Sequence, residues 1–285
     1  MNDPDNQVFI NWSESAAFWD KHRDARRAMF QPIIPALCAD ARIPDSQAAN
    51  SYTVLDEAAG PGDVSFDIAE RLGPKATVWC TDFVPAMVQI AERTALERHA
   101  ANVHCRQCAA EDLPFGSNSV DAIVCRFGVM FFADPFMAIR EAVRVLKPGC
   151  RFSYSVWGTR DANPFHHTVQ DVLDRYVPGP AADLNAPGAY RFAEPGKLAA
   201  IAHGTEATDV RERIFRFEIA APIAFDQFFE LRTEMSDSLR DKLRWMSSEQ
   251  KAQFKEEVRQ NTLRYFTSTG FSFPAEVLIV SGTAA

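Results

Sequence analysis

Residues 53–63 read Thr53-Val54-Leu55-Asp56-Glu57-Ala58-Ala59-Gly60-Pro61-Gly62-Asp63. An apolar start followed by Gly and Pro is typical of a short interior strand that enters a tight turn and then a helix. Gly60 and Gly62 allow backbone angles and close approaches that a side chain would block. Glycine turns of this kind commonly hold nucleotides. We therefore expect a ligand beside this turn, in contact with Asp56, Ala58, Gly60 and Gly62.

The charge of the turn indicates which nucleotide it binds. A dinucleotide pyrophosphate prefers G-x-G-x-x-G at a helix N-terminus, but the register that starts at Gly60 ends at Ser65. Asp56, Glu57 and Asp63 would also repel phosphates at close range. A cationic ligand fits better, and S-adenosylmethionine has a sulfonium, an ammonium, a ribose and an adenine but no phosphate. An NAD-dependent oxidoreductase is the disfavoured alternative.

Three ordered motifs carry a family resemblance. The turn resembles the first motif of class I S-adenosylmethionine-dependent methyltransferases, V-L-D-x-[GA]-x-G-x-G. The run from Arg126 to Pro135 is similar to R-F-G-x-M-F-F-x-D-P in the group around the ubiquinone and menaquinone C-methyltransferases (methyltransferase type 11). Residues 146–150 match L-K-P-G-G except at Cys150. The resemblance spans about residues 9–157 and implies a methyltransferase that releases S-adenosylhomocysteine.

Further cofactor contacts are expected after the second and third strands. Asp82 ends the predicted strand 76–82, close to the ~20-residue offset at which an acidic residue accepts ribose hydroxyls. Phe83 and Met87 open the next helix and suit the adenine ring, although Met87 suits core packing equally well. Residues 109–115 resemble the family segment D-A-E-x-L-P-F, with Ala109 in place of Asp. The resemblance implies adenine recognition by Ala110 and Glu111.

Strands and helices alternate along the chain, with strands predicted at 102–107, 120–127, 151–157, 209–219 and 274–281. Such alternation indicates an α/β, Rossmann-like, doubly wound and mostly parallel sheet. The resemblance implies seven strands with the last one antiparallel. Ligands bind at the carboxyl ends of parallel strands, so the backbone of Cys125 and Arg126 is expected to lie beside the turn and receive the cofactor ammonium.

We expect four parts in the chain. Residues 1–50 form a helical flap, interrupted near Pro32 and Pro35 and followed by a linker at 42–46. Residues 51–222 form the cofactor-binding core, with a mobile segment at 158–192. Residues 223–270 form a helical cap, and residues 271–285 return as the final core strand. The aromatic residues of the first part also suit an amphipathic helix packed on the core.

Methyl transfer needs the acceptor in line with the sulfonium methyl, and a general base helps when the acceptor carries a proton. His166 and His167 follow the fifth strand on the side where substrate is expected, and His22 lies in the flap. An aromatic-rich cap favours a planar or apolar small molecule. The acceptor atom (carbon, oxygen, nitrogen or sulfur) and the use of a base stay open, because one fold hosts all these chemistries. A protein that binds S-adenosylmethionine without methyl transfer is the other alternative.

Composition excludes several classes. The 285 residues carry a net charge of -8, which argues against nucleic acid, and no apolar run approaches the ~20 residues of a membrane span. The acidic start at residues 1–5 lacks a signal-peptide pattern, so we expect a cytoplasmic protein. Six scattered cysteines favour reduced thiols; the one C-x-x-C pair, Cys105 and Cys108, has no second pair to complete a metal site. The oligomeric state stays open.

Overall fold

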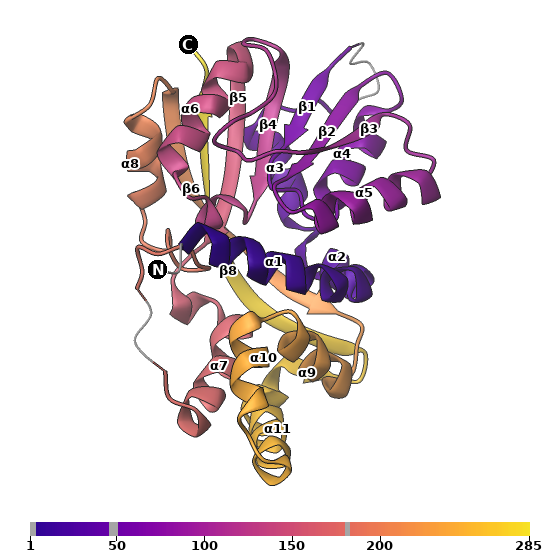
Figure 1. The fold of residues 1–285 in the computed structure, drawn as a ribbon, viewed down its shortest axis with the longest axis vertical. Coiled ribbons are helices and arrows are strands. Elements are labelled where there is room, and N and C mark those ends of the chain that lie inside the picture. The colour runs from indigo at the N-terminus through magenta and orange to yellow at the C-terminus, as the bar shows by residue number, and fades with distance from the viewer. Residues whose placement is uncertain (1–3, 46–50, 180–182) are drawn as a thin grey trace.

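The computed structural model describes residues 4–45, 51–179 and 183–285. Its centre is one sheet with the strand order β3-β2-β1-β4-β5-β8-β6, seen in Figure 1. The strands are β1 (Thr53–Asp56), β2 (Thr77–Asp82), β3 (Val103–Gln107), β4 (Val120–Arg126), β5 (Leu146–Trp157), β6 (Thr208–Ala221), β7 (Phe266–Thr267) and β8 (Gly270–Thr283). Strands β1 to β5 pair in parallel, whereas β8 runs antiparallel to β5 and β6. The predicted Rossmann-like sheet is confirmed, with the short β7–β8 hairpin as an addition.

Helices cover both faces of the sheet. They are α1 (Pro4–Lys21), α2 (Arg23–Phe30), α3 (Ile33–Asp40), α4 (Asp63–Leu72), α5 (Pro85–Glu97), α6 (Pro135–Val145), α7 (Pro164–Tyr176), α8 (Lys197–His203), α9 (Phe225–Glu234), α10 (Asp237–Arg244) and α11 (Ser248–Thr262). Right-handed crossovers put the helices of the β1–β3 half and of the β4–β5 half on opposite faces. Accordingly α3 contacts α4, and α6 contacts α8. The interior strands are apolar because both faces are covered; Val54, Leu55 and Ile123 are fully buried.

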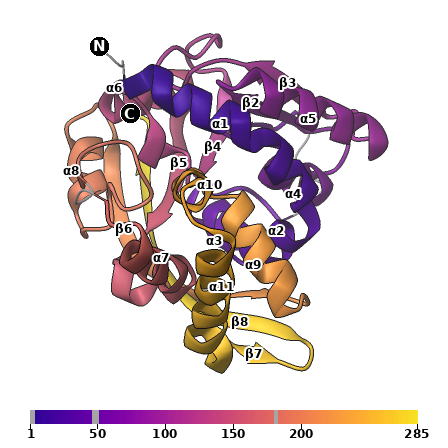
Figure 2. The ribbon, with the colours of Figure 1, turned by 60° about the horizontal axis from the view of Figure 1, so that its bottom comes forward.

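Helix α1 lies across the carboxyl ends of the parallel strands, between the sheet and the C-terminal helices (Figures 1 and 2). The ring of Phe9 meets Phe83, which follows β2, at 5.8 Å between centroids. The ring of Trp12 meets Phe131, which follows β4, at 5.1 Å. These contacts place an N-terminal helix directly over the edge of the sheet where a ligand was expected.

The breaks in the N-terminal helices differ from the prediction. Pro32 caps α3, so the break expected there is confirmed. The break expected at Pro35 is wrong: Pro35 lies in the first turn of α3, where a missing N–H costs no intrahelical hydrogen bond. A further break at His22 separates α1 from α2. The predicted linker ends at residue 46, which lies outside the described residues.

The C-terminal helices α7, α9, α10 and α11 gather at the end of the molecule opposite α6 (Figure 1). The segment 225–265, expected as helical, divides into three helices because Ser236 and Ser247 each cap a new one. The region predicted to be mobile, 158–192, contains the well-formed helix α7, while residues 180–182 lie outside the description. Among the described helices, none combines the length and hydropathy needed to cross a bilayer.

Salt bridges tie the junction of α1 and α2 to α9. Lys21 Nζ lies 2.6 Å from Glu230 and 2.8 Å from Glu234, and His22 Nε2 lies 2.6 Å from Glu234. Ser15 in α1 donates a 2.7 Å hydrogen bond to Asp237 at the start of α10. The N-terminal helices are therefore fastened to the C-terminal helical region as well as to the sheet.

Candidate functional site

The glycine turn sits at the point where the strand order reverses, between β2 and β4. Its backbone is left-handed at Ala58, Gly60 and Gly62, with φ of 49°, 57° and 90°. The amide of Glu57 donates to Val124 of β4 at 2.9 Å, and the amide of Ala59 donates to Thr81 of β2 at 2.8 Å. Ligands of open α/β sheets bind at this reversal point. The expected placement of the turn is therefore what the structure shows.

The end of β4 approaches the turn closely, as expected for the segment at Cys125 and Arg126. A Cβ atom added to Gly128 would lie 2.4 Å from Cβ of Ala58 and 2.8 Å from Sγ of Cys125. Gly128 has ordinary right-handed backbone angles, φ -75° and ψ -44°. Glycine is therefore required at this position because there is no room for a Cβ atom, and not because of its backbone angles.

Gly128→Ala is expected to lower the free energy of unfolding by about 1–3 kcal/mol, because the added methyl group pushes the β4 end away from the turn. Thermal or urea denaturation measures the loss. Gly116→Ala is the matched control, since a Cβ there meets nothing within 4 Å. Equal stability of the two variants would contradict the close approach.

Asp82 holds the turn in place. Its Oδ2 accepts a 2.9 Å hydrogen bond from the amide of Gly60, and its Oδ1 accepts one of the same length from Val84. Asp82 is 7% exposed, and burial raises its pKa to about 6. The structure thus brings Asp82 beside Gly60, at the turn where the sequence predicts a ligand.

The residues expected near adenine have mixed surroundings. Phe83 packs against Phe9, and Met87 is 2% exposed in a small cluster with Ala16 of α1. Ala110 is buried. Oε1 of Glu111 accepts a 3.2 Å hydrogen bond from the amide of Asp134. Met87 therefore packs beneath α1, and one carboxylate oxygen of Glu111 is engaged by the backbone of Asp134.

Two fully buried carboxyl groups lie at the start of the turn. Asp56 Oδ2 accepts a 2.6 Å hydrogen bond from Ser65, and Glu57 Oε2 accepts a 2.5 Å bond from Tyr154. The other oxygens, Asp56 Oδ1 and Glu57 Oε1, have no partner among the residues that the structure describes. Burial raises the pKa of Asp56 to about 7 and that of Glu57 to about 8. Each side chain thus has one satisfied and one free oxygen.

Asp63 at the start of α4 is paired with two arginines. Arg26 Nη1 lies 2.7 Å from its carboxylate, and Arg126 Nη2 lies 3.3 Å away. The side chain of Arg26 is 1% exposed and that of Arg126 is 7% exposed. Within the described chain, Arg26 Nε and Arg126 Nη1 have no hydrogen-bond partner. We call these two nitrogens, together with Asp56 Oδ1 and Glu57 Oε1, the open polar atoms.

Arg26 was not among the predicted site residues. It comes from α2, far from the glycine turn in sequence, and the turn itself gives no sign of it. The one available signal is periodicity: Arg26, Met29 and Phe30 share the buried face of α2. An arginine on an apolar helix face is a candidate for a buried ion pair.

The sequence predicts three anions facing the ligand at Asp56, Glu57 and Asp63, and this prediction is wrong in part. Instead, two guanidinium groups face Asp63, and burial raises the pKa values of Asp56 and Glu57 toward neutrality or above. The site therefore presents both hydrogen-bond donors and acceptors, and repulsion of phosphate by a cluster of anions does not describe it.

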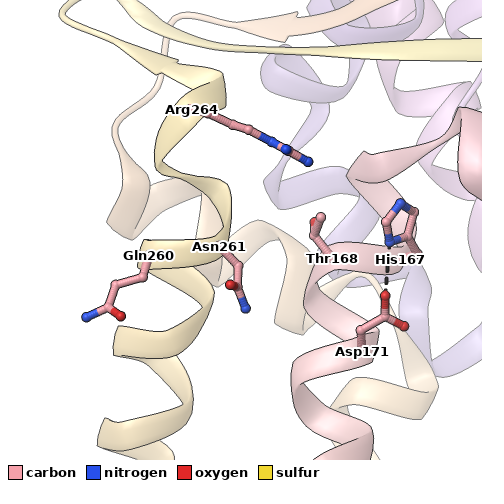
Figure 3. A pocket seen from close by; sticks show the side chains of 6 residues that line it. All are labelled: His167, Thr168, Asp171, Gln260, Asn261 and Arg264. Carbon is pink, nitrogen blue, oxygen red and sulfur yellow. Dashed lines mark hydrogen bonds and ion pairs between the residues drawn. The ribbon is translucent and has the colours of Figure 1, made fainter.

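The two candidate bases have different surroundings. The ring of His166 meets Trp157 at 4.3 Å, and its enclosed Nε2 has no partner within the described residues. Burial lowers the pKa of His166 well below its usual range. His167 instead lines a groove of about 390 Å³ between α7 and α11, where its Nδ1 lies 3.0 Å from Asp171 (Figure 3). Arg264, in the short 3-10 helix Leu263–Tyr265 that follows α11, extends into the same groove. His22 is paired with Glu234.

The six cysteines are free thiols. Cys105 lies in β3 beside Cys80 of β2, which is its register partner, and Cys108 follows the strand. Across the described residues, no three His, Cys, Asp or Glu side chains gather as a metal ion would require.

Residues 54–149 match a protein-family model described as a methyltransferase domain. Over 101 residues the chain is 43% identical to the ubiquinone/menaquinone biosynthesis C-methyltransferase UbiE of Rhizobium meliloti (strain 1021), covering 35% of this chain and 39% of that protein. It is 34% identical over 140 residues to UbiE of Geotalea daltonii, covering 49% and 60%. The chain thus matches less than two thirds of the length of these relatives.

Solved structures share the fold. The YcgJ protein of Bacillus subtilis has a TM-score of 0.56 at 21% identity, covering 89% of this chain and 98% of that one. A phosphoethanolamine N-methyltransferase of Haemonchus contortus, in complex with S-adenosyl-L-methionine, has a TM-score of 0.55 at 15% identity, covering 93% and 57%. The [4+2]-cyclase SpnF has a TM-score of 0.52 at 17% identity, covering 90% and 82%. Because a cyclase has the same fold as methyltransferases, the fold alone does not identify the reaction.

Proposed function

From the resemblance of this chain to class I S-adenosylmethionine-dependent methyltransferases, carried by the domain at residues 54–149, we propose that the protein binds S-adenosylmethionine and transfers its methyl group. The acceptor is a small molecule. S-adenosylhomocysteine is the second product.

The open polar atoms are the observation that carries this proposal. The amino-acid end of S-adenosylmethionine is a zwitterion, with a carboxylate that needs donors and an ammonium that needs acceptors. Arg26 Nε and Arg126 Nη1 are donors, whereas Asp56 Oδ1 and Glu57 Oε1 are acceptors. Buried polar atoms of a folded protein are nearly always satisfied. A ligand with both charges satisfies both kinds of atom.

The remaining parts of the cofactor have candidate partners nearby. Each oxygen of Asp82 accepts one backbone amide and has a further lone pair for a ribose hydroxyl. Phe83 offers a ring to the adenine, with Ala110 and Glu111 on the next strand end. We assign these residues to the ribose and adenine on this basis.

The N-terminal helices complete the site in this proposal. Arg26 reaches Asp63 only because α2 lies against α4, and α1 covers Phe83 and Phe131. We propose that residues 1–50 act as a flap and residues 223–270 as a cap, which together exclude water. Water exclusion strengthens the electrostatic interactions within a site.

The chain's own residues position the reactants. When bound, the cofactor supplies an activated methyl group on a sulfonium. Arg26, Arg126, Asp56 and Asp82 fix its two ends, and holding two reactants in line can supply ~7–11 kcal/mol of barrier reduction. Trp157 and Phe127, whose rings stack at 4.2 Å, form an apolar wall beyond the turn. Where the acceptor loses a proton, we assign Nε2 of His166 as the base that takes it.

Titration calorimetry with S-adenosylmethionine and S-adenosylhomocysteine tests the binding half of the proposal. A coupled assay for S-adenosylhomocysteine with candidate acceptors tests the transfer half. Tight binding without product from any acceptor would favour a binding protein, and tight binding of NADH instead would favour an oxidoreductase.

Asp82→Ala is expected to weaken S-adenosylmethionine binding by ~2 kcal/mol or more, because a charged acceptor of two hydroxyl groups is lost. Calorimetry on folded protein measures the change. Asp121→Ala is the control: Asp121 lies at the opposite end of β4, where it pairs with Lys147 at 2.6 Å. Equal affinity of the Asp82 variant and the native protein for S-adenosylmethionine would contradict the assignment of Asp82 to the ribose.

His166→Ala is expected to lower turnover by about a hundredfold without changing cofactor affinity, as loss of a general base does. His167→Ala, the neighbouring change in the groove of α7 and α11, is expected to leave turnover within a few-fold. If both variants turn over like the native protein, neither histidine is the base.

A further inference from the structure

Arg232 of α9 is a buried cation, 8% exposed. No carboxylate of the described chain lies within ion-pair distance of it or shifts its pKa. Its Nε has no hydrogen-bond partner in the described residues, and its guanidinium carbon lies 4.5 Å from the ring centre of Phe165. Burial lowers the pKa of Arg232 to about 10, which leaves it charged near neutral pH. Such a charge is costly unless something anionic pairs with it.

Two more enclosed polar atoms lie near Arg232, since the Phe165 ring beneath its guanidinium meets the ring of His166 at 5.5 Å between centroids. The hydroxyl group of Tyr190 and Nε2 of His166 both lack partners among the described residues. Their rings lie 6.2 Å apart. The charge of Arg232 acts on both: it helps to lower the pKa of His166 and opposes the burial that raises the pKa of Tyr190 to about 12. We call His166, Tyr190 and Arg232 the cap cluster.

Aromatic rings connect the cap cluster to the glycine turn. His166 meets Trp157 at 4.3 Å, and Trp157 stacks on Phe127 at 4.2 Å. Phe127 directly follows Arg126, which pairs with Asp63. The cap cluster therefore lies beyond the methyl-donor site, separated from it by flat apolar rings.

We propose that the cap cluster is the acceptor subsite and that it takes a small aromatic carboxylic acid. The proposal rests on the proposed methyl transfer. The carboxylate pairs with the guanidinium of Arg232 in the two-pronged geometry that this side chain favours. The hydroxyl group of Tyr190 donates to the same carboxylate, and the aromatic ring lies against Trp157.

The methyl transfer forms one bond and breaks one bond. A nucleophilic atom of the bound acid forms a bond to the methyl carbon, and the bond from that carbon to sulfur breaks with its electron pair remaining on sulfur. The proton that the acceptor atom loses moves to Nε2 of His166. The sulfonium becomes a neutral thioether, and the acceptor keeps its carboxylate on Arg232.

A carboxylate fits better than the other ligands that a cation binds. A neutral planar molecule would leave Arg232 unpaired. A phosphate monoester carries close to two negative charges near neutral pH, and the cap cluster offers one charged partner in an aromatic enclosure. The single charge of a carboxylate matches the single guanidinium.

Calorimetry with the full chain saturated with S-adenosylhomocysteine tests this subsite. The probes are benzoate, phenylacetate and 3-phenylpropanoate, each with its neutral amide, and phenyl phosphate. We expect at least one acid to bind about tenfold or more tightly than its amide, as a charge-assisted hydrogen bond provides. Arg232→Met should remove that preference, and Arg232→Lys should restore part of it. Acids and amides of equal affinity, no acid binding, or tighter binding of phenyl phosphate would overturn the assignment.

Arg259→Met is the matched control. Arg259 also lies over a phenylalanine ring, Phe225 at 4.1 Å, but it is half exposed and pairs with Asp226. It should leave acid binding unchanged. A second readout separates ligand binding from a structural role: without ligand, Arg232→Met is expected to raise the Tm, since an unpaired buried charge is removed. A fall in Tm with unchanged acid preference would contradict the proposal. Binding of S-adenosylhomocysteine, measured alone, reports on the proposed function independently.

Discussion

Asp63→Asn is expected to lower the free energy of unfolding by about 3–5 kcal/mol, the loss typical when one partner of a buried ion pair is removed. The change leaves the guanidinium groups of Arg26 and Arg126 facing each other with no carboxylate between them. Both are almost completely buried. Urea denaturation at neutral pH measures the loss, and S-adenosylmethionine affinity should fall with it, because the arginines lose their shared anchor.

Asp67→Asn is the control that α4 itself provides. Asp67 lies one helical turn after Asp63 and pairs with Arg27 at 2.5 Å, next to the Arg26 pair, but Arg27 is 37% exposed. A partly exposed pair is typically worth ~0.2–1 kcal/mol. Similar losses in the two variants would show that burial of the Arg26 pair does not set its energy.

Glu57→Gln is expected to become progressively more stable than the native protein as pH rises, by roughly 4 kcal/mol between about pH 5 and about pH 9. Burial raises the pKa of Glu57 from 4.5 in the unfolded chain to about 8. Its contribution to stability is therefore fully present below pH 4.5 and is lost as pH rises through about 8. Glutamine does not ionise and still accepts the hydrogen bond of Tyr154. Denaturation of both proteins across this range measures the difference.

Tyr154→Phe supplies an independent check of that pH dependence. The hydroxyl group of Tyr154 lowers the pKa of Glu57 against the larger effect of burial. Without it, the pH dependence should move to higher pH. A constant difference between Glu57→Gln and native protein at all pH values would rule out a raised pKa. Glu57→Gln is thus expected to raise stability at high pH and to weaken cofactor binding, because it removes a carboxylate oxygen expected to face the cofactor.

The sequence was sufficient for the sheet because its determinants are local. The apolar run at Val54 and Leu55, the glycines of the turn and the segment at 146–150 each specify a strand end or a turn without reference to distant residues. Asp82 could be placed beside Gly60 for the same reason, since consecutive parallel strands meet at one edge. The breaks at His22 and within 225–265 were not predicted, although those at Ser236 and Ser247 have local causes, since each serine caps a new helix.

The charges of the site could not be predicted in the same way. Arg26 pairs with Asp63, 37 positions further along the chain, and no sequence pattern in either segment predicts this contact. The same holds for Arg232, which reaches Phe165 through the packing of α9 on α7. His166 and His167 are adjacent in sequence, yet about 100° of helical rotation gives them different partners. Tertiary contacts thus decide which ionisable groups share a site.

The bridges from Lys21 and His22 to Glu234 have a thermodynamic consequence. The helix that follows His22 brings Arg26 to the proposed cofactor site, and the helix that ends at Glu234 brings Arg232 to the proposed acceptor subsite. Ligand binding at either site is therefore expected to affect the same salt bridges between the N-terminal helices and α9. We expect positive cooperativity between donor and acceptor, and reciprocity requires each ligand to raise the affinity of the other by the same factor.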